Sequence, residues 1–365
     1  MRLLIITQFS ALGGSSRIQV IQFFPFFEKA GIGYRHLKIY SDRFYRVQNG
    51  IVEAAPWRKK MNFFLGMLAG FLKKAAVVFA ASRYDAVLIQ REVFPRSWYW
   101  LMRRVNPRII YEIEDTIYEI NPFWQRGGSY DLALRYQARM CRNMMRYAWG
   151  VIAENEYLGA EARHHNPRVF YITAPIDTDR YHPSTIARDN NQVTVGWIGS
   201  PATSYMLKNL ELVFAEISRR HPGAILKAVG APPDFSIEGI RFVKKEWREA
   251  DEPADLESFD IGLMPLDDTP FNRGRLGYKM IQYMAVGIPV VAADVGLNRT
   301  VIKDGENGFL VKTPEEWTEK LSLLISDAAL RARLGADGRK MAEKTFSLAE
   351  QSQSFLAIIK QCARL

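Results

Sequence analysis

The sequence predicts an α/β protein with two doubly wound, parallel-sheet domains. Short apolar β-type runs alternate with helical segments along both halves of the chain, which is typical of βαβ units. With 365 residues, the chain is too long for one ordinary core and suits two domains of about 180 residues. Between the halves, Ala174–Gln192 contains two prolines, an Asp/Asn cluster and no apolar period, so we interpret it as a linker.

The composition is that of an ordinary globular protein. Hydrophobic residues make up 48% of the chain and charged residues 24%, which excludes extensive disorder. Cys141 and Cys362 match no metal or redox spacing and are interpreted as free thiols in a reducing compartment. The N-terminus, MRLLIIT, lacks a cleavage signal and is expected to be a first strand. These features favour a cytoplasmic location.

The net charge of +10 suits nucleic acid, an anionic membrane or phosphorylated small substrates. Zinc-finger, basic-zipper and RNP-type signatures are absent from the sequence, so only the charge would support nucleic acid, and we expect none as a partner.

The first half contains six expected strands, separated by amphipathic segments such as Ile18–Lys29 and Leu132–Tyr147. The strands are RLLIIT, GYRHLKIY, YDAVLIQ, RIIYEIE, GVIAENE and RVFYIT. Such alternation predicts a parallel sheet that is covered on both faces.

A second series of six strands follows the linker, and helices are expected at Leu207–Arg219, Arg275–Val286 and Glu315–Ser326. The strands are VTVGWIGS, AILKAVG, IRFVKK, DIGLMPL, IPVVAAD and GFLV. Leu348–Ala363 forms one long amphipathic helix. Two such domains would place a ligand cleft between them, at the carboxyl ends of their strands.

One segment of the first half, Trp57–Arg83, is a strongly apolar helix with basic residues at its start and at Lys73 and Lys74. The internal lysines make it a poor membrane-spanning helix. Two interpretations remain, and they are compatible: a buried helix of the first domain, or a helix on an anionic membrane surface.

The loop after the first strand, SALGGSSR, has Gly13 and Gly14 ahead of a helix that starts near Ser16, with Arg17 in its first turn. Glycines allow close backbone approach, and free N–H groups at a helix start favour an anion. The loop lacks the third glycine of the dinucleotide fingerprint, so NAD binding is not expected. A tight turn and a phosphate loop remain equally good interpretations.

The second domain opens in a similar way. In GWIGS a strand ends and Gly199 and Ser200 turn the chain, while Lys208 lies on the following helix, where an exposed lysine is the plain alternative. Trp247 follows a later strand and either stacks on a nucleobase or plugs the edge of the domain.

A cationic stretch, NRGRLGYKMIQ, precedes the strand IPVV. Arg275, Lys279 and Gln282 are spaced at i, i+4 and i+7, which predicts one helix face. Arg273 lies just before them, and Gly274 loosens the expected helix start. A diphosphate would complement both the cations and the N–H groups, although a solvated face is the common fate of such a stripe.

At this point the second half resembles a known family. The segments YMAVGIPVVAADVG, NRTVIKDGENGFLV and LRARLGADGRKMAEKTFS are similar to the donor-binding domain of family 4 retaining glycosyltransferases, which have the GT-B fold of two facing Rossmann-like domains with a cleft between them. The first half agrees more loosely, through GGSSR and YDAVLIQREVFP. The resemblance implies an acceptor-binding domain at 1–175, a linker at 176–192 and a donor domain at 193–347. The final helix, 348–365, is expected to return to the N-terminal domain.

The sequence departs from this family at its paired glutamates. Gln282 and Gly274 stand at the positions of the two acids, which contact the ribose and the donor sugar in the family. A neutral amide still hydrogen-bonds hydroxyls, so nucleotide binding is retained in this interpretation, whereas carboxylate assistance is in doubt. Asp267 and Asp268 are possible replacements, with turn capping as the alternative.

The resemblance also implies a reactive group after the fourth strand of the first domain. The family often has a histidine there, and this chain has Glu114 and Asp115. We expect Asp115 to orient an acceptor hydroxyl or act as its base, with an N-cap of the Thr116–Ile120 turn as the alternative.

The resemblance, together with these features, implies an enzyme that transfers a sugar, with retention, from a nucleotide-diphosphate donor to a glycan or lipid-linked acceptor. Lys279 and Arg273, with Lys208, would stabilise the departing diphosphate, and no metal or other cofactor is expected. The alternative is a non-catalytic nucleotide-sugar binder or a scaffold for an active partner, which the missing glutamate pair motivates.

Overall fold

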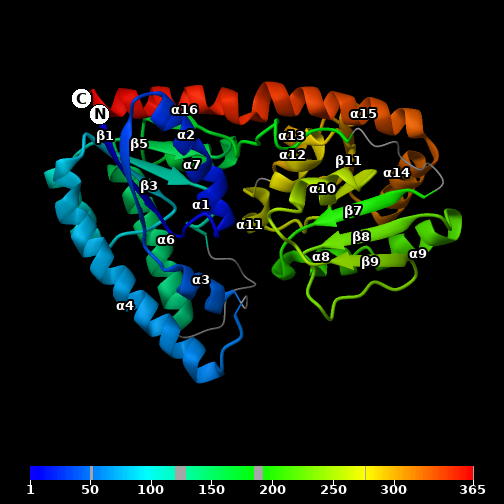
Figure 1. Ribbon diagram of the computed structural model, residues 1–365, viewed down its shortest axis with the longest axis horizontal. Helices are drawn as coiled ribbons and strands as arrows, with labels where there is room; N and C mark the ends of the chain where they lie inside the picture. The colour runs from blue at the N-terminus through cyan, green and yellow to red at the C-terminus, as the bar shows by residue number, and fades with distance from the viewer. Residues whose placement is uncertain (50–51, 120–128, 185–191, 276, 365) are drawn as a thin grey trace. The chain divides into compact units, whose positions relative to one another are not determined.

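The computed structural model describes residues 1–49, 52–119, 129–184, 192–275 and 277–364. The chain forms two compact units, the first of Met1–Pro175 with Gln351–Leu365 and the second of Ile176–Glu350. Each unit is built on one six-stranded parallel sheet with helices packed against it (Figure 1). The predicted α/β class with two Rossmann-like domains is therefore confirmed. Residues 185–191 of the predicted linker lie outside the described residues.

The sheet of the first unit has the strand order β2-β1-β3-β4-β5-β6. Its strands are β1 (Arg2–Thr7), β2 (Gly33–Lys38), β3 (Ala86–Gln90), β4 (Ile109–Ile113), β5 (Gly150–Ala153) and β6 (Val169–Tyr171). All six coincide with the apolar runs in the sequence. β1, β3, β4 and β5 are almost wholly buried on both faces, which explains why those runs lack polar alternation.

The helices of the first unit differ from the predicted pattern at one place. They are α1 (Gly14–Gln19), α2 (Phe24–Lys29), α3 (Asp42–Gln48), α4 (Pro56–Ala80), α5 (Arg96–Val105), α6 (Ser129–Tyr147) and α7 (Glu156–Arg163). The single helix expected at Ile18–Lys29 is wrong: α1 ends at Gln19, and a 3-10 turn leads into α2. Pro25 lies in the first turn of α2, where its missing N–H is tolerated.

The last helix, α16 (Leu348–Ala363), has the bounds that the sequence predicts. From Gln351 onward it belongs to the first unit. Phe355 is buried there, with its ring centroid 4.7 Å from that of Phe23 and 5.6 Å from that of Phe27. The amphipathic period of this helix thus seats its apolar side on the start of the chain.

The second unit has the strand order β12-β11-β10-β7-β8-β9, again entirely parallel. Its strands are β7 (Thr194–Ile198), β8 (Ile225–Val229), β9 (Arg241–Lys245), β10 (Ile261–Met264), β11 (Val290–Ala293) and β12 (Gly308–Val311). These also match the six predicted runs.

Two predicted helices of this unit need correction. The helices are α8 (Tyr205–Lys208), α9 (Glu211–Arg220), α10 (Glu252–Glu257), α11 (Pro270–Arg273), α12 (Tyr278–Ala285), α13 (Asn298–Val301), α14 (Pro314–Ser326) and α15 (Ala328–Met341). The helix expected at Leu207–Arg219 is divided into α8 and α9. The helix expected at Arg275–Val286 begins only at Tyr278, after the N-cap Gly277, so Arg275 precedes it.

Candidate functional site

In both sheets the first strand of the chain is an interior strand, and later strands are added on both sides of it. β1 lies between β2 and β3, and β7 lies between β8 and β10. Ligands of doubly wound sheets bind at such switch points, outside the carboxyl ends of the strands. The residues that follow β1, β3 and β4 in the first unit, and β7 and β10 in the second, are therefore the candidates.

The first unit places an arginine and two acids at its switch point. Arg91, directly after β3, donates from Nη1 to Oε1 of Glu114 at 2.7 Å and to Oγ of Ser15 at 3.1 Å. The same Nη1 atom lies 3.5 Å from Oδ2 of Asp115. Glu114 is buried, whereas 23% of the Asp115 side chain is exposed. Asp115 is therefore the more accessible acid of this pair.

The backbone at this edge is strained. Arg91 has φ 58° and Asp115 has φ 53°, and among the described residues they are the two non-glycine residues with positive φ. The left-handed conformation costs an L-residue about 1 kcal/mol or more, and such residues concentrate at functional sites. Asp115 begins a turn that runs to Tyr118, and Ile120 lies outside the described residues, so the N-cap alternative for Asp115 stays a prediction.

A buried polar layer lies beneath these residues. Glu112 of β4 lies in register with Gln90 of β3. Burial raises the pKa of Glu112 well above its ordinary value, and the neighbouring carboxylates of Glu114 and Glu154 raise it further. Burial also raises the pKa of Glu114, although the Arg91 guanidinium opposes this. The layer therefore favours neutral acids below a charged Arg91.

The glycine loop after β1 is adjacent to this site. Gly13 is the N-cap of α1, and a Cβ there would lie 2.9 Å from Cβ of Phe9, whereas a Cβ on Gly14 would meet no atom within 4 Å. Arg17 donates from Nη1 to the carbonyl oxygen of Ala11 at 3.2 Å, within the same loop. The open space around Gly14 leaves its backbone accessible.

In the second unit, Lys279 is the residue placed most directly at the switch point. Its Nζ atom lies 4.5 Å from the centroid of the Trp197 ring, at the end of β7. A Cβ on Gly199 would lie 2.7 Å from this Nζ atom and 2.4 Å from the Trp197 ring. Burial, together with the charge of Arg275, lowers the pKa of Lys279 to about 7. The Lys279 side chain is half-buried, and its amine has no acidic partner among the described residues.

Tyr283 holds the two strands at this point. Its hydroxyl donates to the carbonyl oxygen of Leu263 in β10 at 3.2 Å and accepts from the backbone N–H of Ile198 in β7 at 3.2 Å. A single α12 side chain therefore links the strand ends that frame Lys279.

Two other predicted cations, Arg273 and Lys208, are paired with acids. Arg273 forms a two-point ion pair with Asp268, with Nε 2.6 Å from Oδ1 and Nη2 3.1 Å from Oδ2. Lys208 pairs with Glu211 at 3.1 Å, and 43% of its side chain is exposed. Both cations already have acidic partners, so a diphosphate would have to compete for them.

The remaining predicted residues line the same loops. Ser200 accepts through its carbonyl oxygen from the N–H of Thr203, which forms a 3-10 turn after Gly199. Gly274 is the C-cap of α11 and is buried. The two acids proposed as replacements for the family's glutamates both have partners. Asp267 accepts a hydrogen bond from Nδ2 of Asn209, the C-cap of α8, at 3.0 Å, and Asp268 pairs with Arg273.

Trp247 and Gln282 meet at a residue that the sequence analysis did not identify. Glu252, 6% exposed, accepts from Nε2 of Gln282 at 2.8 Å. It also accepts from Nε1 of Trp247 and from the hydroxyl of Tyr181. Three side-chain donors, two of them 30 or more positions away in the chain, therefore converge on one buried carboxylate, which fixes the Trp247 ring and the Gln282 amide.

Sequence reasoning also missed Arg91 and Trp197. Arg91 stands in IQREVFP, where a charged residue directly after a buried strand was the available signal. For Glu252 no such signal exists, because the acidic stretch EADEPADLE is typical of a solvated surface. Within the part of the chain that the structure describes, no group of three or more His, Cys, Asp or Glu side chains is arranged to hold a metal ion.

In comparison with known proteins, most of the second unit is similar to a family of enzymes. Residues 192–327 match the family model described as Glycosyl transferases group 1. A D-inositol 3-phosphate glycosyltransferase from Rhodococcus opacus is 29% identical over 230 residues, which are 53% of this chain and 50% of that protein. A trehalose synthase from Pyrococcus horikoshii is 25% identical over 160 residues, 40% of this chain and 39% of that protein. The chain spans half or less of the length of these curated relatives.

Solved structures share the fold along the whole chain. The Anabaena protein Alr3699/HepE in complex with UDP aligns with a TM-score of 0.67 and 17% identity, over 99% of this chain and 100% of that one. Sucrose-phosphate synthase from Thermosynechococcus elongatus aligns with a TM-score of 0.70 and 15% identity, over 99% of this chain and 98% of that one. At these identities the likeness establishes the GT-B fold class.

Proposed function

We propose that this chain, whose residues 192–327 match the family model described as Glycosyl transferases group 1, transfers a sugar from a nucleotide-diphosphate donor to a glycan or lipid-linked acceptor with retention. The observation that carries the proposal is the half-buried Lys279 amine beside Trp197 and Gly199, at the switch point of the second unit. UDP is the first nucleotide to test, since it is the ligand in the aligned HepE structure.

The chemistry of the site supports a departing diphosphate as the group that Lys279 binds. The amine has no acidic partner among the described residues, and Arg275 is close enough to lower its pKa. Gly277, the N-cap of α12, has no side chain that could cap the helix or block an anion from approaching its start. A diphosphate would receive both charge and hydrogen bonds here, and its charge increases as the sugar leaves.

Asp115 is the proposed acceptor-side group. It is partly exposed at the carboxyl edge of the first sheet, and its neighbour Arg91 orients it. In this role its carboxylate accepts a hydrogen bond from the acceptor hydroxyl and takes the proton as the new bond forms.

The test combines donor binding with turnover. UDP, GDP, ADP, dTDP and their glucose conjugates would be screened by thermal shift against wild type, Lys279→Ala and the control Lys340→Ala, an exposed lysine of α15. We expect one nucleotide to stabilise wild type and the control but Lys279→Ala much less. Turnover of Lys279→Ala should fall by about 100-fold or more.

Three outcomes would contradict parts of the proposal. No stabilisation by any nucleotide would exclude a nucleotide-sugar donor. Equal donor-dependent rates for wild type and Lys279→Ala would exclude the role of this lysine. Stabilisation without sugar release or transfer, across a panel of glycan and polyprenyl-phosphate acceptors, would favour the non-catalytic binder, for which the neutral Gln282 at the family's acidic position is the motivating observation.

A further inference from the structure

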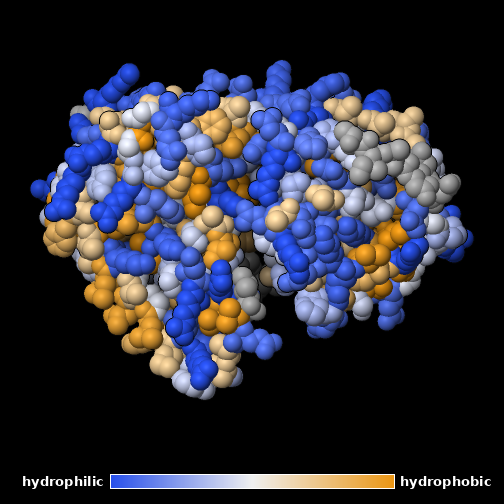
Figure 2. Space-filling model, in the orientation of Figure 1, coloured by the Kyte–Doolittle hydropathy of each residue, from blue (hydrophilic) through white to orange (hydrophobic). Residues whose placement is uncertain are grey.

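Helix α4 exposes an apolar side that the first unit does not cover. By length and composition alone, Pro56–Arg83, which comprises α4 and the 3-10 turn after it, could cross a membrane. Only 17% of its most apolar 18-residue stretch is buried inside the protein. Six side chains spaced along one side are between 47% and 70% exposed: Trp57, Met61, Phe64, Leu68, Leu72 and Phe79. Hydrophobic atoms gather over this helix at the lower left of the space-filling view (Figure 2). The alternative of a buried helix is therefore wrong.

The opposite side of α4 is seated firmly on the domain. A Cβ on Gly66 would lie 2.0 Å from the Phe44 ring, and one on Gly70 would lie 3.0 Å from the Tyr40 ring. Val77 is also buried. Because these small residues allow close packing along three turns, the helix cannot leave the domain to span a bilayer without exposing part of the core.

The two internal lysines do not interrupt the apolar side. Lys73 donates from Nζ to the carbonyl oxygens of Lys38 and Ile39, at 3.1 and 3.0 Å. Lys74 donates to the carbonyl oxygen of Val93 at 2.9 Å and pairs with Glu92 at 2.6 Å. Lys74 is half-buried, whereas Lys73 is exposed, with its amine held against the carbonyl oxygens that end β2 and follow it. At helical spacing neither lysine lies on the side formed by Trp57, Met61, Phe64, Leu68, Leu72 and Phe79.

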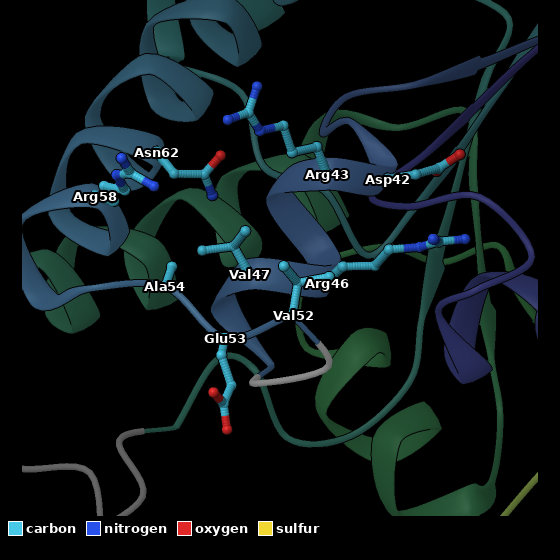
Figure 3. Close-up of a pocket in the computed structure, with 9 residues that line it drawn as sticks. All are labelled: Asp42, Arg43, Arg46, Val47, Val52, Glu53, Ala54, Arg58 and Asn62. Atoms are coloured by element: carbon cyan, nitrogen blue, oxygen red, sulfur yellow. The ribbon is translucent and has the colours of Figure 1, made fainter.

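The basic groups lie instead at the N-terminal end of α4. A pocket of about 440 Å³ between α3 and α4 is bordered by Arg43, Arg46 and Arg58. Figure 3 shows Arg58 and Asn62 extending from α4, Arg43 and Arg46 from α3, and the Glu53 carboxylate directed away from them. None of the three guanidinium groups lies within ion-pair distance of a described acidic residue, although the charge of Arg46 contributes to lowering the pKa of Asp42, which also lines the pocket. Arg58 also covers the Trp57 ring, with Cζ 5.2 Å from its centroid.

We propose that α4 lies in the interface of an anionic lipid membrane, with its apolar side in the acyl region and the arginine pocket at the phosphate headgroups. A helix with an apolar side, an interfacial tryptophan and a basic end is suited to this position. A second copy of the chain is a poorer occupant, since each copy has a net charge of +10 and would bring its own unpaired arginines to the contact. An anionic bilayer complements both features. This inference goes beyond the proposed sugar transfer and does not depend on it.

Vesicle flotation of the full chain tests the proposal. Wild type should float with vesicles containing about one-third phosphatidylglycerol in phosphatidylcholine and much less with phosphatidylcholine alone. Phe64→Glu/Leu68→Glu should reduce the floated fraction by about tenfold. The control Leu212→Glu makes the same change at a residue of α9 that is 84% exposed, and it should float like wild type.

The headgroup part has its own variant. Arg43→Gln/Arg46→Gln/Arg58→Gln should remove most of the preference for anionic vesicles, while Arg241→Gln/Arg248→Gln/Arg333→Gln, with the same loss of charge in the second unit, should retain it. An unchanged melting temperature would show that each variant is folded. Wild type that stays unbound with anionic vesicles, or flotation that persists in Phe64→Glu/Leu68→Glu, would overturn the proposal. So would a wild-type oligomer without flotation that the same double variant dissociates, because the face would then bind a second copy.

Discussion

Gln282 and Glu252 form a buried amide–carboxylate pair in the second unit, with Nε2 2.8 Å from Oε1 and side chains that are 5% and 6% exposed. Family 4 glycosyltransferases, which this sequence resembles, usually have a glutamate at the position of Gln282. Two carboxylates at this distance would repel each other in a region with little water. The carboxylate of Glu252, which also accepts hydrogen bonds from Tyr181 and Trp247, therefore explains why residue 282 is neutral.

The first prediction follows from this pair. Gln282→Glu should lower the stability at pH 7 by about 2 kcal/mol, because a second buried carboxylate is placed beside the first. The added carboxyl has a folded pKa above its unfolded value, so the deficit appears as the pH rises from about 4.3 through the folded pKa and disappears in acid. Melting temperatures of variant and wild type from pH 5 to pH 8 would measure it.

A charge swap supplies the control. Glu252→Gln/Gln282→Glu restores one acid and one amide, and it should recover part of the stability that Gln282→Glu alone loses. If the swap is no more stable than Gln282→Glu, the carboxylate repulsion is not the cause, and the shape of the site around Gln282 must be.

The strands of this protein could be predicted from the sequence, whereas the site could be predicted only in part. Buried parallel strands are continuous apolar runs, and each run has its strand, as RLLIIT has β1. The apolar period of a sequence does not show where a helix ends, because capping residues decide this. Arg275 has the spacing of the α12 face, but it precedes the N-cap residue Gly277 and therefore lies outside the helix. The Gln282–Glu252 contact joins residues that are 30 positions apart, so no local spacing announces it.

The second prediction concerns the pH dependence of donor binding. The pKa of Lys279 is lowered to about 7 by burial and by Arg275. A bound diphosphate would favour the charged amine, so binding above pH 7 requires uptake of a proton. The affinity for UDP should therefore fall by up to about tenfold for each pH unit above 7, as calorimetric titrations from pH 6 to pH 9 would record.

Lys279→Arg is the matched variant, because arginine keeps its charge throughout this range. Its affinity should be weaker at pH 6 but nearly constant up to pH 9. Lys279 should also affect the stability of the protein. Because its pKa is lower in the folded than in the unfolded state, the unfolded state binds more protons between about pH 7 and pH 10.5. The free energy of unfolding should therefore increase with pH over this range. Lys279→Met should reduce this increase. If the affinity for UDP changed equally with pH in wild type and in Lys279→Arg, another titrating group would control donor binding.

The third prediction compares alanine substitutions in the two glycine loops, at Gly199 after β7 and at Gly14 after β1. Gly199→Ala should destabilise the protein by about 1–3 kcal/mol and weaken UDP binding, since its Cβ would lie 2.4 Å from the Trp197 ring and 2.7 Å from Nζ of Lys279. Gly14→Ala should leave stability nearly unchanged, because its Cβ would meet no atom within 4 Å. Urea unfolding and thermal shift with UDP would compare them. If Gly14→Ala keeps full stability and full turnover, a close backbone approach of substrate at Gly14 is excluded.

The fourth prediction uses the strained backbone of Asp115. Asparagine tolerates the left-handed conformation, so Asp115→Asn should fold with nearly wild-type stability, whereas Asp115→Ala should lose about 1 kcal/mol and Asp115→Gly should recover it. Turnover should follow the carboxylate instead: all three variants should lose about 100-fold or more, and the stabilisation by donor should stay unchanged. The control Asp234→Asn, at an exposed position of the second unit, should affect neither quantity. Wild-type turnover in Asp115→Asn would show that the strain at this residue shapes the loop around Arg91 and that its carboxylate takes no part in the transfer.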